Sequence, residues 1–97
     1  MIDNAYFCHL FQRALLFNIP KVVDLISFKI GENNLIKIFI FSKRKLNEKE
    51  QDYIFSAISE LEGDFTEEIT MDLEFVVVET IPSDLTPYGS VVFAFVE

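Results

Sequence analysis

Apolar residues recur along this chain with two different periods. In residues 3–17 and 47–63 they return every three or four positions, which is the spacing of one apolar helix face. Four other runs are rich in Ile, Val, Leu and Phe, as β-strands are: 21–31, 35–42, 66–80 and 90–96. The pattern predicts two helices and four strands in the order αββαββ.

The two predicted helices have clear boundaries. Asp3 or Asn4 is suited to cap the first helix, and Pro20 prevents it from extending past residue 19. Asn47 is predicted to cap the second helix together with Glu50 three residues later, and Gly63 ends it. The side chains expected to be buried are Phe7, Leu10, Phe11, Ala14 and Leu15, and then Tyr53, Ile54, Ala57, Ile58 and Leu61.

The first two predicted strands form a hairpin, because 31–34 is a turn sequence of Gly, Glu and two Asn residues. The second of them, 35–42, is apolar on nearly both faces, which predicts a central place in the sheet. The strand 66–80 alternates, with Ile69, Met71, Leu73, Phe75 and Val77 on one face and Glu68, Thr70, Asp72 and Glu74 on the other. After Glu74, Val76 and Val78 make both faces apolar, so we expect a bulge or deeper burial there.

These elements predict a single α+β domain over residues 1–97. We expect a four-stranded, mainly antiparallel sheet with the two helices packed on one face. The length fits one hydrophobic core, and 51% of the residues are hydrophobic, as in globular proteins.

Side chains for catalysis or metal binding are scarce. Cys8 and His9 are the only cysteine and histidine, and neighbours on a helix point about 100° apart, so we expect Cys8 to be partly buried and His9 to face solvent. Zinc sites need three or four ligands, which one cysteine and one histidine do not supply. The three glycines are isolated, so they do not form a phosphate-binding loop. We therefore expect that the protein is not an enzyme and that it binds no metal and no cofactor.

The net charge is −8, which argues against nucleic-acid binding. The start carries Asp3, and polar residues interrupt the first apolar run, so no secretory signal is expected. No apolar run approaches the roughly 18 residues of a membrane span. These features predict a cytoplasmic protein without a membrane partner, and a monomer or weak dimer when free.

The charge is divided unevenly along the chain. The first 46 residues carry seven basic and three acidic residues, whereas the remaining residues carry thirteen acids and only Lys49 as a base. These acids either solvate the outer faces of a helix and a strand, or form a docking surface for a basic partner. The basic run 43–45 is interpreted as a solvated loop, or as a segment that pairs with the acidic half of a second copy.

The order of elements resembles a group of small acidic proteins that act as immunity proteins in bacterial polymorphic-toxin and contact-dependent growth inhibition systems. The similarity extends from about Phe11 over most of the chain, through LIKIFIFS and the KLNEKEQDYIFSAISELEGDF segment to the terminal VVFAFVE. Such proteins have an aromatic second hairpin strand and a helix between an acidic turn and an acidic-aromatic pair. The matching residues here are Glu48, Glu50, Asp64 and Phe65.

The resemblance implies a partner, a cognate toxin domain that is often a nuclease with a basic groove. An acidic inhibitor would occupy or flank such a groove. The expected partner-binding residues are the acids of the second half together with one aromatic anchor: Glu60, Glu62, Asp64, Glu67, Glu68, Asp72, Glu74 and Tyr88. Two alternatives stay open, a small-ligand-binding module and a homo-oligomeric interaction module.

Overall fold

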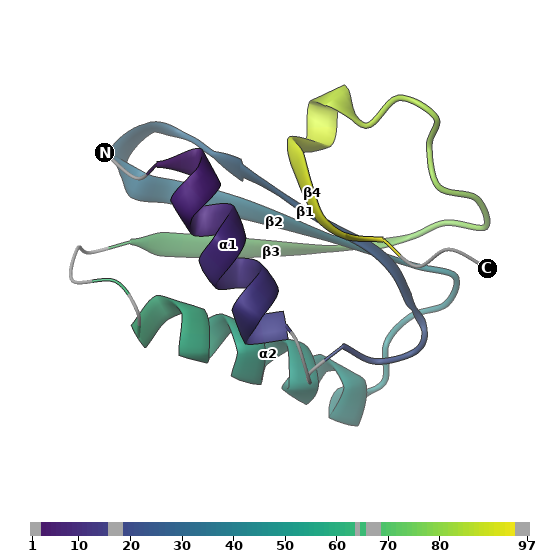
Figure 1. Ribbon diagram of the computed structural model, residues 1–97. Coiled ribbons are helices and arrows are strands. Elements are labelled where there is room, and N and C mark those ends of the chain that lie inside the picture. The colour runs from purple at the N-terminus through teal and green to yellow at the C-terminus, as the bar shows by residue number, and fades with distance from the viewer. Residues whose placement is uncertain (1–2, 16–18, 64, 66–68, 95–97) are drawn as a thin grey trace.

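A computed structural model of the chain describes residues 3–15, 19–63, 65 and 69–94. Its elements follow the predicted order: α1 (Asn4–Leu15), β1 (Val23–Ile30), β2 (Leu35–Ser42), α2 (Glu48–Gly63), β3 (Thr70–Val77) and β4 (Ser90–Ala94). Two short 3₁₀ turns, η1 (Glu32–Asn34) and η2 (Thr86–Tyr88), precede β2 and β4. Figure 1 shows the helices and the four-stranded sheet, so the α+β class is confirmed.

The strand order is β3-β2-β1-β4, and the sheet is mixed. The pairs β1–β2 and β1–β4 are antiparallel, but β2 and β3 run parallel from Leu35↔Thr70 to Ser42↔Val77. The prediction of a mainly antiparallel sheet was therefore wrong. The reason is that α2 lies between β2 and β3 in sequence, and a helical crossover returns the chain to the end where β2 began.

The main core lies between the sheet and both helices, as predicted. The expected apolar faces of α1 and α2 are buried against Ile26, Phe28 and the even-numbered isoleucines of β2. Tyr53 is the exception, since 45% of it is exposed and the expectation that it is buried was wrong. It precedes Ile54 by one position, and one position turns a side chain by about 100° out of the apolar stripe.

A second, smaller cluster lies on the opposite face of the sheet, which is called the open face below because α1 and α2 both pack on the other side. Leu25, Phe39 and Phe41 are buried there beneath the connection between β3 and β4, which contributes Val78, Ile81, Leu85 and Tyr88. A register shift between Val23 and Leu25 explains why these two side chains belong to different clusters.

The end of β3 combines one correct and one wrong expectation. Val76 packs into the second cluster, so deeper burial is confirmed, and the pairing with β2 stays in register without a bulge from Thr70 to Val77. Val77, predicted to face the core, is 52% exposed. It lies at the last position of the strand, at the level of Ser42, where β2 also ends.

Candidate functional site

Two of the predicted partner-binding acids lie side by side on β3. Asp72 and Glu74 are exposed and alternate with Met71, Leu73 and Phe75, which pack against the main core. They therefore belong to the open face. In the register with β2, Asp72 lies beside Lys37 and Glu74 beside Phe39. The acids of β3 thus form a short stripe at the edge of the sheet.

The acids of α2 occupy a different layer. Glu60 and Glu62 are exposed near the end of a helix that packs on the face opposite Asp72 and Glu74. Asp64, Glu67 and Glu68 lie outside the described residues. The structure therefore does not bring Glu60 and Glu62 onto one face with the acids of β3.

Tyr88, the predicted aromatic anchor, is engaged inside the chain. It is half-buried, and its ring meets those of Phe39 and Phe41 nearly at right angles, with centroids 5.1 and 4.9 Å away. Aromatic rings favour this edge-to-face arrangement. The ring holds the connection between β3 and β4 against the open face, and Gly89, with a φ of +82°, allows the chain to pass close to β1.

A groove with two lysines lies beside this acidic stripe. It has a volume of about 290 Å³ and is lined by Lys29, Ile30, Gly31, Leu35, Lys37, Phe39 and Pro87. The Lys37 ammonium lies 5.9 Å from the centre of the Phe39 ring, within the range of a cation–π contact. Sequence reasoning missed this groove because only the pairing of β1 with β2 places Lys29 opposite Lys37.

An exposed aromatic side chain borders β3 on the helix side. Phe55 of α2 is 44% exposed, and its ring stands perpendicular to that of Phe75 at a centroid distance of 6.2 Å. Sequence reasoning did not single out Phe55. The signal was present, since a phenylalanine lies outside the apolar stripe of an otherwise polar helix face.

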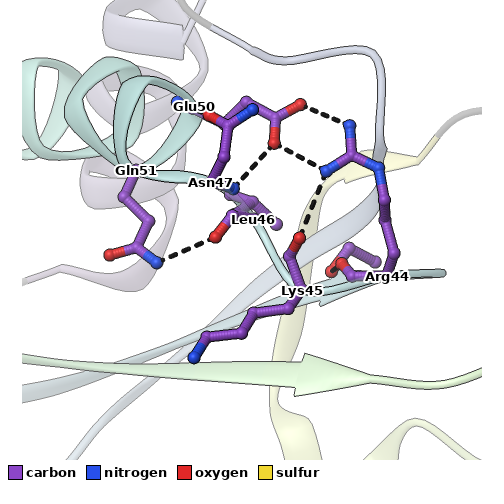
Figure 2. A network of polar contacts seen from close by, with 7 residues as sticks. Arg44, Lys45, Leu46, Asn47, Glu50 and Gln51 are labelled. Carbon is purple, nitrogen blue, oxygen red and sulfur yellow. Dashed lines mark hydrogen bonds and ion pairs between the residues drawn. The ribbon is translucent and has the colours of Figure 1, made fainter.

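The start of α2 is fixed by a network of charged and amide groups, shown in Figure 2. The Asn47 side chain accepts from the Glu50 N–H at 2.8 Å, and the Glu50 carboxylate accepts from the Asn47 N–H at 2.9 Å, which confirms the predicted cap. Arg44 donates two bonds to the same carboxylate, at 2.8 and 2.7 Å. Arg44 is therefore paired within its own chain, while its side chain stays 56% exposed, so the interpretation of the basic run as a solvated loop agrees with the structure.

This network shifts the titration of both partners. Hydrogen bonds from Arg44 and from the Asn47 N–H lower the pKa of Glu50 from 4.5 to about 2. The pKa of Arg44 is raised by the same pair. The capping carboxylate is thus ionised at neutral pH, and it orients the loop that leads from β2 into α2.

The described residues contain no cluster of metal-binding side chains. Within residues 3–15, 19–63, 65 and 69–94, no three His, Cys, Asp or Glu side chains are placed to hold a metal ion. Cys8 is half-buried and His9 is exposed, as predicted. None of the described helices has the length and apolar character needed to cross a membrane.

The sequence was compared with known protein families and with curated proteins. The family model described as MafI2 immunity protein matches residues 5–97, which is nearly the whole chain. No curated protein matches the sequence.

Proposed function

Since the chain belongs to the MafI2 immunity protein family, it has an immunity role against a toxin, and we propose that its partner is a basic nuclease domain. In this proposal the chain neutralises the toxin by binding alone, in the cytoplasm of the cell that makes both. Acidic residues meet the groove in which the toxin would otherwise hold nucleic acid. The family membership carries the immunity role, and the charge of the chain supports the nature of the partner.

Electrostatics supports a basic partner. A net charge of −8 on 97 residues attracts a basic domain over distances of about a Debye length, roughly 8 Å at physiological salt. Asp72 and Glu74 are exposed on β3, so their carboxylates are accessible to a partner. Such steering raises the association rate more than it strengthens the final complex.

Co-purification with the protein encoded directly upstream tests this proposal. We expect a one-to-one complex whose association slows as salt is raised from about 50 to 500 mM, because screening weakens exposed charge pairs. A complex whose association rate does not respond to salt would contradict the electrostatic part of the proposal. Failure to form any complex would contradict the pairing itself.

Charge reversal tests whether the acids of β3 form the toxin-binding surface. Glu74→Lys is expected to slow association with the toxin by about tenfold while the unfolding free energy stays within about 0.5 kcal/mol, because the side chain is exposed. Glu32→Lys makes the same change in net charge on exposed η1 and serves as the control. Equal slowing by both variants in stopped-flow measurements would show that only the total charge matters, and not the acids of β3.

A further inference from the structure

Within the described residues, no strand pairs with the outer edge of β3. β3 is the last strand in the order β3-β2-β1-β4, eight residues long and in continuous register with β2. An edge strand directs the N–H and C=O groups of alternate residues away from the sheet, where they are available to another strand. Figure 1 shows β3 as a long straight strand at this border of the sheet.

The opposite edge differs in each of these respects. β4 has five residues, and its pairing with β1 shifts register between Ile26 and Ser27. The side chain of Gln12 in α1 donates to the Val92 carbonyl at 3.4 Å, and the side chain of Asn4 reaches the Ser90 hydroxyl at 3.3 Å. Short length, irregular register and covering side chains are the usual ways to block an edge. In the described residues the β3 edge has none of these three features, and what it carries instead are the charges of Asp72 and Glu74.

The side chains along β3 would select the strand that joins it. Asp72 and Glu74 point to the open face, while Met71, Leu73 and Phe75 lie on the helix face and are partly buried. Phe55 and Val77 add exposed apolar surface at this border. A complementary strand therefore alternates basic residues opposite the acids with apolar residues opposite Phe75 and Phe55.

A second copy of this chain fits the edge poorly. An antiparallel pair of β3 strands centred on Leu73 would place Asp72 of each copy opposite Glu74 of the other. Like charges directly opposite destabilise a strand pair. The same two acids that prevent self-association attract a basic strand, so charge complementarity favours a different protein as the occupant.

We propose that an extended strand of the toxin domain, alternating basic and apolar residues, adds to the free edge of β3 and is held by main-chain hydrogen bonds. Asp72 and Glu74 meet its basic side chains, and Phe55 with Phe75 receives its apolar ones. This mode gives affinity through the backbone and specificity through alternate side chains. The inference rests on the immunity role proposed above and specifies how the toxin is bound.

Amide hydrogen exchange of the free chain and of its complex with the upstream-encoded toxin domain tests this binding mode. We expect alternate amides within Thr70–Val77 to exchange at least about tenfold more slowly in the complex, because new hydrogen bonds protect them. The amides of β4 serve as the internal reference and are expected to change little. A stable complex that protects cells but leaves the β3 amides unchanged would overturn strand addition and leave the immunity role intact.

A matched pair of variants tests the proposed apolar contact between Phe55 and the toxin strand. Phe55→Ala is expected to weaken the complex by about tenfold or more, as truncation of an interface aromatic does. Tyr53→Ala is the control, because it removes an equally exposed ring that points away from Phe55 on the same helix. Equal loss for both variants, or no loss for Phe55→Ala, would contradict the proposed contact. Absence of any complex with the unmodified chain would overturn the immunity proposal for that toxin and strand addition with it.

Discussion

Two buried serines differ in whether their hydroxyl group has a hydrogen-bond partner. Ser42 and Ser27 both have no exposed surface, but Ser42 donates to the Arg44 carbonyl at 2.7 Å. The Ser27 hydroxyl has no hydrogen-bond partner among the described residues. A buried hydroxyl without a partner loses its contacts with water and gains nothing in return.

Replacement of these serines is expected to have opposite results. Ser27→Ala should leave the unfolding free energy unchanged within about 0.5 kcal/mol or raise it, whereas Ser42→Ala should lower it by about 1 kcal/mol. Urea unfolding of the two variants measures the difference. If Ser27→Ala destabilises the chain as much as Ser42→Ala, then Ser27 has a partner in solution.

Gly89 is needed for close packing of the connection between β3 and β4. Its φ is +82°, and a Cβ at this position would overlap the Phe28 carbonyl oxygen and the Lys29 side chain. We expect Gly89→Ala to lower the unfolding free energy by more than about 2 kcal/mol in thermal unfolding. Gly63→Ala is the control, because no atom lies within 4 Å of the added Cβ. Similar melting temperatures for both variants would contradict this role for Gly89.

At the scale of elements, the ion pair at the start of α2 makes the stability of the fold depend on pH. The pKa of Glu50 is lowered to about 2 in the folded chain, from an ordinary value of 4.5. Ionised Glu50 therefore stabilises the fold fully above about pH 4.5, and this contribution is lost as the pH falls towards 2. Glu50→Gln is expected to have a lower unfolding free energy than the unmodified chain. This difference should be largest at neutral pH and should shrink below pH 4.5.

Urea unfolding between pH 7 and pH 2 measures this dependence. Glu48→Gln removes an exposed carboxylate from the same turn and controls for the general effect of a first-turn acid. A stability difference between the unmodified chain and Glu50→Gln that does not change with pH would contradict the Arg44–Glu50 account.

The capping box also shows which features of the fold the sequence predicts. Asn47 and Glu50 are three residues apart, so their contact follows from local geometry and was predicted. Arg44 lies outside the helix, and its path depends on how β2 ends, so its bond to Glu50 was not predicted. The parallel direction of β3 was missed for a similar reason, because hydrophobic alternation shows the faces of a strand but not its direction.

In the candidate site, too, local features were predicted from the sequence and features that depend on distant residues were not. Alternation correctly predicted that Asp72 and Glu74 are exposed on one face. Glu60 and Glu62 were grouped with these acids by charge alone, but α2 packs on the other face of the sheet, as the predicted layers already implied. The groove with Lys29 and Lys37 arises from strand pairing between distant residues.

At the scale of the whole molecule, the faces and edges of the sheet are covered to different degrees. Both helices cover one face of the sheet, and the connection between β3 and β4 covers part of the other. This arrangement leaves the edge of β3 exposed, with its acidic stripe and the neighbouring Phe55, and this is where we propose that the partner binds. An inhibitor that acts by binding needs a rigid scaffold of this kind, because little ordering then opposes association.

Growth rescue tests the central claim most directly. Cells that express the upstream-encoded toxin domain are measured for growth with and without this chain, and with an unrelated acidic protein as the control. The immunity role predicts full growth only when this chain is present. Continued arrest despite soluble, folded chain would contradict it.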